Sequence, residues 1–326
     1  MNFWKQRFGS PAEGENVTKK DVPTPDPYTQ TNTPQGQGQI DRVAQDRTIQ
    51  DLQNSLQSVY TMLAHERHRV DILLARSEGV LDEIEQFHEI RRTKRYQRVF
   101  NASRPLVSVL VATMNECDLL IDRCLNSIRA QSYDNLQVIV VGDHCTDDTE
   151  RRLAELRDTR ISFVNRPECG PYPRGREERR MVAGSYPLIE ALNRVEGDFI
   201  TYLDDDDAYA PDRIEVLVNA VQTEKADFVW HPHFWRQADG SWLLRGNGNL
   251  EHGQVGLGMV LYHAYLGRVK PDVYAYRLKE PGDWNLIRRL KALRPRTCFV
   301  DKPLTFFYKE WTQVPFVERP GEQFIE

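Results

Sequence analysis

The chain has 326 residues, enough for one large domain and an appendage. Its formal net charge of −5, with 28% charged residues, gives no general attraction to nucleic acid or to an anionic membrane. No run approaches the roughly 18 apolar residues that a membrane-spanning helix needs, and the N-terminus lacks the long apolar core of a signal peptide. The five cysteines are scattered without a CxxC pair, which indicates reduced thiols. We therefore expect a cytoplasmic protein with no transmembrane segment and no nucleic-acid partner.

Two segments precede the main domain. Residues 1–40 are rich in proline, glutamine, threonine and glycine, and this composition predicts a disordered tail because little apolar surface offsets the entropy lost on ordering. Residues 41–98 carry a heptad pattern that predicts a coiled-coil helix. Ten of its twelve a and d positions are apolar, with a at Ile49, Leu56, Leu63, Val70, Ser77 and Ile84, and d at Leu52, Val59, Glu66, Leu73, Val80 and Phe87.

The apolar stripe of this helix is wider than a strict dimer seam, because flanking positions such as Tyr60 and Leu74 are apolar too. We expect a homo-oligomer formed through residues 49–87, either a dimer or a larger assembly. A helix folded back onto the main domain is the alternative. The basic run Arg91–Arg98 is interpreted as a solvated helix end, since one short patch would neutralise few phosphates.

The main domain is expected over residues 104–312, followed by a tail over 313–326. Apolar strand-like runs alternate there with segments of helical spacing, a pattern typical of a mostly parallel sheet flanked by helices. The fold class is therefore α/β and Rossmann-like. The strands are predicted at 106–112, 136–142, 160–165 and 198–203.

Polar clusters follow three of these strands, at Thr113–Glu116, Gly142–Asp148 and Asp204–Asp207. Ligands of parallel sheets bind beyond the carboxyl ends of the strands, so the clusters should converge on one rim. Neither GxxxxGK[ST] nor a GxGxxG after a strand is present to cradle phosphates. A divalent cation is then the natural way to neutralise a nucleotide diphosphate, and hard oxygen ligands select Mg²⁺ or Mn²⁺.

The four consecutive aspartates fit such a site. Adjacent side chains point to opposite sides of an extended chain, so Asp204 and Asp206 share one side. One can contact the nucleoside while the other holds the metal. The alternative is a solvated acidic turn that caps the following helix, which would account for Asp207 and Asp212.

Two stretches carry a specific resemblance: PLVSVLVATMNECDLLIDRCLNSIRAQSYDNLQVIVVGDHCTDDT and GDFITYLDDDDAYAPDRI. They resemble the nucleotide-binding half of the family-2 inverting glycosyltransferases, which have the GT-A fold. The resemblance runs from about Pro105 to Tyr308. It implies transfer of a sugar from a nucleotide-diphosphate sugar to an acceptor hydroxyl with inversion, as in the hexosyltransferase class. A UDP-sugar is the default donor, dTDP and GDP remain alternatives, and the acceptor is a glycan, a lipid-linked molecule or a protein.

The resemblance also implies roles for individual residues. Binding of the nucleoside falls to Thr113, Asn115, Glu116 and Asp143. In the DxD motif, Asp206 is the expected metal ligand, with Asp204 as a second ligand and Asp204 or Asp205 near the ribose. The stretch YPRGREERRMVAG resembles a bacterial branch of the family, and either Arg176 or Arg180 could approach the diphosphate.

An inverting displacement needs a base for the acceptor hydroxyl. The family places an acidic residue at the start of a late helix, and Asp283 takes that position in KEPGDWNLIRRL, with Glu280 as the fallback. The alternative is that Asp283 only caps its helix. The chain departs from many relatives in one respect. It has no histidine after His263, where those relatives carry one that completes the metal site.

The stretch WHPHF places His231 and His233 two residues apart on an expected strand. We interpret them, with Trp230, as part of an acceptor cleft, because aromatic faces stack well on sugar rings. A metal-binding pair and a plain buried strand are the alternatives.

Two rival functions remain. A sugar-nucleotidyltransferase would need a glycine-rich signature after the first strand, and TMNE has none. A non-enzymatic coiled-coil scaffold with a degenerate domain is disfavoured by the intact DxD motif and Asp283.

Overall fold

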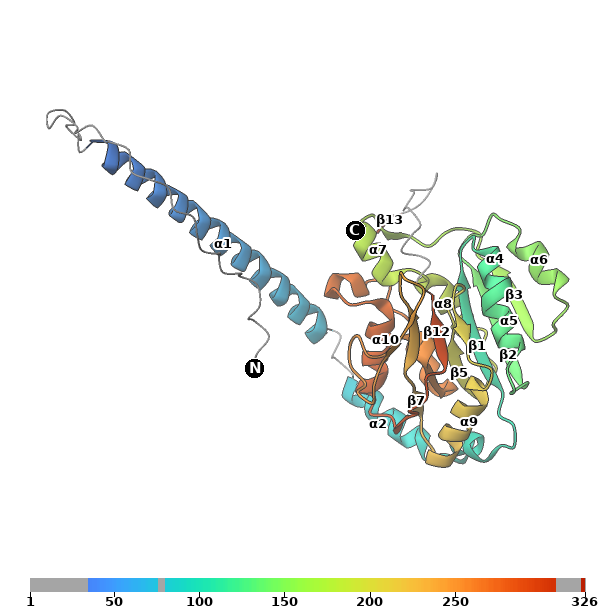
Figure 1. Ribbon diagram of the computed structural model, residues 1–326. Helices are drawn as coiled ribbons and strands as arrows, with labels where there is room; N and C mark the ends of the chain where they lie inside the picture. The colour runs from blue at the N-terminus through green and yellow to red at the C-terminus, as the bar shows by residue number, and fades with distance from the viewer. Residues whose placement is uncertain (1–34, 76–79, 309–323, 326) are drawn as a thin grey trace, which may run out of the picture. The chain divides into compact units, whose positions relative to one another are not determined.

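The computed structural model describes residues 35–75, 80–308 and 324–325 (Figure 1). The chain divides into two compact units, residues 1–64 and 65–326. Helix α1 (Gln35–Ala75) begins inside the stretch for which the sequence predicts a tail. The described apolar side chains at its heptad positions are exposed by half or more: Ile49, Leu52, Leu56, Val59, Leu63 and Val70. The oligomer expected through this stripe stays a prediction.

After the end of α1, the second unit continues with α2 (Val80–Arg91), α3 (Lys94–Gln97) and the short helix η1 (Arg98–Asn101). The core of this unit includes Phe87, Tyr96, Val99 and Phe100. The folded unit therefore begins earlier in the chain than residue 104, where the main domain is predicted to start. The C-terminal end of the apolar stripe therefore packs in cis onto this unit, as Phe87 is buried and Ile84 is packed against the core.

The basic run attaches α2 and α3 to the domain. Arg91 forms an ion pair of 3.3 Å with the buried Asp227, and the Tyr96 hydroxyl donates a hydrogen bond of 2.9 Å to the same carboxylate. Asp227 also accepts from the Arg296 guanidinium at 2.8 and 3.2 Å. Part of Arg91–Arg98 thus has a structural role, although the sequence analysis interprets it as a solvated helix end.

The central sheet of the described residues has seven strands in the order β11-β7-β10-β5-β1-β2-β3. Strand β10 runs antiparallel to both of its neighbours, and the other pairs are parallel, which confirms the expected mostly parallel sheet. The strands are β1 (Val107–Thr113), β2 (Leu136–Gly142), β3 (Ile161–Asn165), β5 (Phe199–Tyr202), β7 (Phe228–Trp230), β10 (Val260–His263) and β11 (Thr297–Phe299).

Helices cover this sheet, as in Figure 1. Helix α8 (Ser185–Leu192) packs on β1 and β2, and α9 (Arg213–Glu224) packs on β7 and β11. The strands are fully buried in the centre, as Val109, Leu110 and Ile139 show. The other described helices are α4 (Cys117–Leu119), the π-helical segment η2 (Leu120–Leu125), α5 (Asn126–Arg129), α6 (Thr149–Glu155), α7 (Arg176–Val182) and α10 (Gly282–Ala292). Three 3-10 turns are η3 (Leu257–Met259), η4 (Ala264–Arg268) and η5 (Ala275–Leu278).

A second sheet adjoins the first, in the order β6-β12-β8-β9. Its strands are β6 (Ala208–Tyr209), β12 (Thr305–Phe307), β8 (His233–Arg236) and β9 (Trp242–Arg245). A small parallel pair joins β4 (Tyr172–Pro173) to β13 (Phe324–Ile325). The sequence analysis expects one strand through WHPHF, but the chain leaves β7 after Trp230 and starts β8 at His233. Pro232, which has no N–H to donate, lies at this break.

Candidate active site

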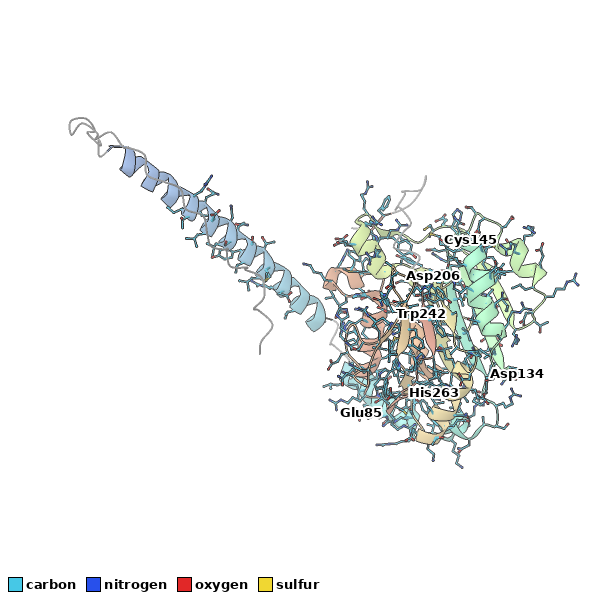
Figure 2. All side chains as sticks on the ribbon, viewed as in Figure 1. Glu85, Asp134, Cys145, Asp206, Trp242 and His263 are labelled. Atoms are coloured by element: carbon cyan, nitrogen blue, oxygen red, sulfur yellow. The ribbon has the colours of Figure 1, made fainter. Side chains whose placement is uncertain are left out.

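Three polar loops meet at the carboxyl edge of the central sheet, as expected. Strand β1 lies between β2 and β5, with Thr113 paired to Gly142 and Leu110 to Tyr202. The Asp143 amide donates to the Thr113 carbonyl at 2.8 Å, which keeps the first two loops in register. Figure 2 shows Asp206 toward the same end of the domain as Cys145, away from Asp134 and His263.

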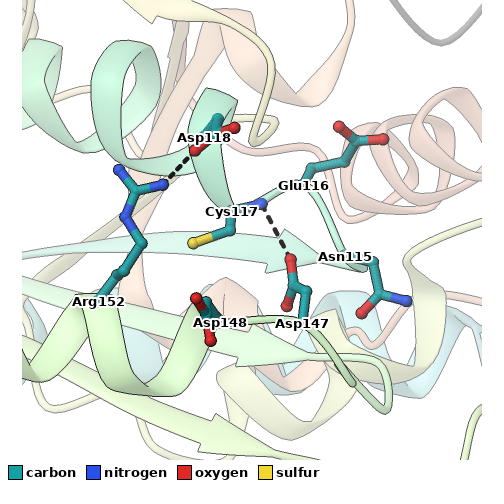
Figure 3. Close-up of a pocket in the computed structure, with 7 residues that line it drawn as sticks. All are labelled: Asn115, Glu116, Cys117, Asp118, Asp147, Asp148 and Arg152. Atoms are coloured by element: carbon teal, nitrogen blue, oxygen red, sulfur yellow. Dashed lines mark hydrogen bonds and ion pairs between the residues drawn. The ribbon is translucent and has the colours of Figure 1, made fainter.

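The loops after β1 and β2 are joined by side-chain hydrogen bonds. Asn115 adopts a left-handed conformation with φ of 57°. Its side-chain oxygen accepts from the Thr146 amide at 2.7 Å, and its side-chain nitrogen donates to the Thr146 hydroxyl at 3.3 Å. A pocket of about 360 Å³ opens between the loops (Figure 3). It is lined by Asn115, Glu116, Cys117, Asp118, Asp147, Asp148 and Arg152.

Asp143, an expected nucleoside ligand, is buried and strongly engaged. Its carboxylate accepts from the Tyr172 hydroxyl at 2.5 Å and from the Gly170 amide at 3.1 Å, and it pairs with Arg166. Burial, and then the Asp143 charge, raises the pKa of Tyr172 well above its usual value, so this tyrosine stays a donor. No local motif marks Arg166 or Tyr172, because only the fold brings the segment from the end of β3 to β4 against Asp143.

The acidic turn after β5 gathers three carboxylates. Single oxygens of Asp204, Asp206 and Asp207 lie within 4.8 Å of one another. Asp206 and Asp207 are buried, whereas solvent reaches Asp204. Asp207 accepts from the Tyr308 amide at 2.8 Å. The sequence pattern gives Asp207 only the capping alternative, whereas the structure brings it into this cluster.

The backbone of the turn is held by Arg123, which donates to the Asp206 carbonyl at 2.6 Å. The guanidinium of Arg123 also lies 3.8 Å from the centre of the Tyr308 ring. The end of β12 and segment η2 therefore brace the acidic turn from two sides.

The electrostatics of this turn favour a cation. Nearby protein atoms partly desolvate the Asp204 carboxyl and, together with the charges of Asp206 and Asp283, raise its pKa to about 7. Burial likewise raises the pKa of Asp205 to about 8, while the Thr113 hydroxyl opposes the rise. Repelling carboxylates in a poorly hydrated place gain most from a bound divalent ion, and their oxygens are the ligands that Mg²⁺ and Mn²⁺ prefer. The residues present thus fit such an ion.

Asp283 lies in the first turn of α10, and its charge contributes to the raised pKa of Asp204. Its carboxylate accepts from the Trp284 amide at 2.6 Å. Burial raises the pKa of Asp283, while the Trp284 amide and the positive field of His252 oppose the rise. The N-cap residue of α10 is Pro281, and Asp283 lies two residues later. Asp283 is therefore not the helix cap that the alternative interpretation expects.

Glu280, the fallback base, is engaged elsewhere. Its carboxylate accepts two hydrogen bonds of 2.9 Å from Arg288 and one of 2.8 Å from Asn285. This arrangement favours a structural role for Glu280 at the start of α10.

The three residues assigned to an acceptor cleft are dispersed. Trp230 is buried and donates to the Asn247 carbonyl at 3.2 Å, and His231 is fully buried in the core. His233 is buried against Phe307, with ring centres 4.5 Å apart, and its two ring nitrogens have no hydrogen-bond partner among the described residues. Burial lowers its pKa to about 4, so the imidazole is neutral. Arg176 and Arg180, the diphosphate candidates, occupy exposed positions on α7.

Residues 108–254, which contain all three polar loops, match the family described as Glycosyl transferase family 2. The matched residues, which make up less than half of the chain, form a domain of that family. The match gives no support to the sugar-nucleotidyltransferase alternative.

Two curated relatives are similar to this glycosyltransferase domain. The Escherichia coli UDP-Glc:alpha-D-GlcNAc-diphosphoundecaprenol beta-1,3-glucosyltransferase WfaP is 28% identical over 129 residues, covering 40% of this chain and 46% of the relative. The Campylobacter jejuni GalNAc(5)-diNAcBac-PP-undecaprenol beta-1,3-glucosyltransferase is 29% identical over 159 residues, covering 48% of this chain and 44% of the relative. The chain thus spans less than half of the length of either relative.

The crystal structure of S. aureus TarS 1-349 in complex with UDP-GlcNAc superposes with a TM-score of 0.51 and 18% identity, over 63% of this chain and 59% of that one. This likeness confirms the expected GT-A fold. No helix in the described part of the chain is long and apolar enough to cross a membrane.

Proposed function

We propose that the protein transfers a sugar from a nucleotide-diphosphate sugar to an acceptor hydroxyl with inversion, in a metal-dependent reaction with Asp283 as the base. The observation that carries this proposal is the cluster of Asp204, Asp206 and Asp207 at the end of β5, where single carboxylate oxygens lie within 4.8 Å of one another. Asp283, which is half-buried at the start of α10, is near enough for its charge to raise the pKa of Asp204. The family match of residues 108–254 supports the same chemistry.

The chemistry assigns one task to each group. Asp204, Asp206 and Asp207 would hold a Mg²⁺ or Mn²⁺ ion, which when bound neutralises charge on the leaving diphosphate. Asp283 accepts the proton of the acceptor hydroxyl as that oxygen bonds to the anomeric carbon. The bond from this carbon to the diphosphate oxygen breaks, and its electron pair leaves with the nucleotide. The raised pKa of Asp283 brings its basicity closer to neutral pH, which favours general-base catalysis.

The remaining residues of the carboxyl edge bind the donor in this proposal. The nucleoside lies against the loops that carry Thr113, Asn115, Glu116 and Asp143, with Asp205 near the ribose. Arg180 on α7 remains the candidate for the diphosphate. The name of the Escherichia coli relative supports a UDP-sugar donor, and the names of both relatives support a lipid-linked saccharide acceptor as the first choice. All five cysteines are free thiols, which supports a reducing, cytoplasmic compartment.

Thermal unfolding with UDP, dTDP and GDP, each with and without Mn²⁺, tests the donor part of this proposal. A ligand that binds only the folded state raises the unfolding free energy by RT ln(1+[L]/Kd). We expect UDP with Mn²⁺ to raise the midpoint more than either component alone, and Asp206→Asn to remove this joint effect. No shift with any nucleotide and metal would contradict the proposal.

A further inference from the structure

Arg213, the first residue of α9, is a fully buried arginine. Its Nη1 donates to the Thr201 hydroxyl at 2.9 Å and its Nε to His231 Nε2 at 3.0 Å. Its Nη2 donates to the Gly258 carbonyl at 3.1 Å and to the Val260 carbonyl at 3.2 Å. The guanidinium lies 4.0 Å from the centre of the Tyr209 ring. The acceptors of these hydrogen bonds are a hydroxyl, an imidazole nitrogen and two carbonyls, and none of them is a carboxylate.

Such a buried cation is unfavourable for stability. Removing a guanidinium from water is costly, and here neutral acceptors replace a carboxylate partner. Burial lowers the pKa of Arg213, which reflects the same cost. His231 accepts from Arg213, and burial together with the arginine charge keeps the pKa of His231 far below its usual value. Apolar side chains could fill this position without the cost of burying a charge. The buried guanidinium therefore indicates a role other than stability.

The contacts of Arg213 connect the two halves of the candidate active site. On one side it stacks on Tyr209, which lies two residues after Asp207. On the other side it binds the carbonyl of Gly258, two residues after Gly256. Gly256 lies against Asp283, since a Cβ atom there would come 3.0 Å from Asp283 Oδ2.

The Gly258 carbonyl is a shared anchor. It accepts from Arg213 and also from the Thr305 hydroxyl at 2.9 Å. Thr305 lies in β12 three residues before Tyr308, whose amide binds Asp207. The backbone facing Asp283 and the acidic turn are therefore fixed to the same buried guanidinium and hydroxyl.

We propose that Arg213 is a positioning residue that sets the placement of Asp283 relative to the acidic turn, through the Gly258 carbonyl and the Tyr209 ring. The inference rests on the proposed function, because it assigns Arg213 to the geometry between base and metal site. The described hydrogen bonds of Arg213 do not reach the loops that carry Asn115 and Asp143. Nucleotide binding should therefore depend little on Arg213.

Two substitutions test this role. Arg213→Met removes the charge and keeps an apolar stem, and Thr305→Val removes only the second donor to the Gly258 carbonyl. We expect Arg213→Met to lower the transfer kcat by about 10- to 100-fold, because a displacement of about 1 Å in a reacting group can cost on the order of 100-fold. Thr305→Val should lower kcat severalfold. The Kd for UDP with Mn²⁺, measured by calorimetry, should change by less than about threefold in both.

Arg296→Met is the matched control, because Arg296 pairs with the buried Asp227 and not with the site. It should lower the unfolding midpoint while the folded enzyme keeps its kcat. A normal kcat in folded Arg213→Met would overturn the inference. If that variant does not fold, a normal kcat in Thr305→Val overturns it instead. A wild-type protein that transfers no sugar would count against the proposed function and not against the Arg213 geometry alone.

Discussion

Gly256 lies directly against the Asp283 carboxylate: a Cβ atom on Gly256 would come 3.0 Å from Asp283 Oδ2. The backbone of Gly256, with φ of −130° and ψ of 173°, is open to any residue. The backbone conformation does not require a glycine here. The missing side chain instead leaves space in front of the Asp283 carboxylate. An acceptor hydroxyl needs that space if Asp283 is to take its proton.

Gly256→Ala should accordingly displace the Asp283 carboxylate without straining the chain. We expect the transfer kcat to fall on the order of tenfold to a hundredfold, as for other small misplacements of a reacting group. The unfolding midpoint should stay close to that of the wild type. Gly248→Ala is the matched control, because its Cβ atom would make only an ordinary contact of 3.5 Å with Phe299. Equal activity of the two variants would show that the space at Gly256 has no catalytic use.

The acidic turn predicts a pH-dependent effect of metal. The folded-state pKa values of Asp204 and Asp205, about 7 and about 8, lie above their ordinary value of 3.8. The folded state thus holds protons more tightly than the unfolded chain, and this contribution to stability is lost as pH rises from about 4 to about 8. Mn²⁺ binds the ionised carboxylates, so it should raise the unfolding midpoint more at about pH 8 than at about pH 6. Scanning calorimetry measures this, and a metal effect that weakens with rising pH would speak against the cluster as a metal site.

The attachment of α3 to the domain predicts a change in stability alone. Tyr96→Phe removes the hydroxyl that donates to Asp227 at 2.9 Å, in a place where the carboxylate is fully buried. Hydrogen bonds to charged groups contribute about 1.5–3 kcal/mol, so the free energy of unfolding should fall by about that amount. Urea titration gives this difference. The kcat should not change, because Asp227 has no part in the site.

The exposed stripe of α1 predicts an oligomer. The unit that ends at residue 64 contains Ile49, Leu52 and Leu56, and their exposed apolar side chains would be covered by copies of the same helix. Deleting residues 1–64 should give a smaller species in light scattering that still binds nucleotide. The deletion must not continue to residue 100, because Phe87 and Tyr96 belong to the core. A full-length protein that is already monomeric would remove the basis for this prediction.

Local pattern was enough to predict the part of the fold that carries the polar loops. The strand predicted at 136–142 coincides with β2, and the strand at 106–112 lies one residue from β1. These runs are buried on both faces, so their apolar character is continuous and easily recognised. The antiparallel β10 was missed because VLYH is short and pairs with strands distant in sequence.

The sequence was enough to place Asn115, Asp143 and Asp204 at the carboxyl edge of the sheet, because each follows a strand by one or two residues. Contacts that depend on tertiary packing could not be predicted from the sequence. Asp207 joins Asp204 and Asp206 because the Tyr308 amide holds it, and β12 lies about a hundred residues further along the chain. Arg213 and Gly256 face the site through contacts that no local motif encodes. His231 and His233 look equivalent in the sequence, yet Pro232 separates them into different environments.

Glu280 and Asp283 offer a matched pair of carboxyl-to-amide changes on the same helix start. Glu280→Gln weakens charged hydrogen bonds with Arg288, so it should cost about 1.5–3 kcal/mol of unfolding free energy and leave kcat nearly unchanged. This variant calibrates how much activity is lost when α10 is merely destabilised.

The most direct test of the proposed mechanism is the transfer rate of Asp283→Asn with a UDP-sugar, Mn²⁺ and a competent acceptor, measured beside wild type and Glu280→Gln. Asparagine preserves the size of the side chain and can still accept from the Trp284 amide, but it cannot take a proton at neutral pH. If Asp283 is the base, transfer falls on the order of 10²–10⁴-fold while the Kd for UDP with Mn²⁺ barely changes. Transfer by Asp283→Asn at a rate close to that of the wild type would contradict this role of Asp283.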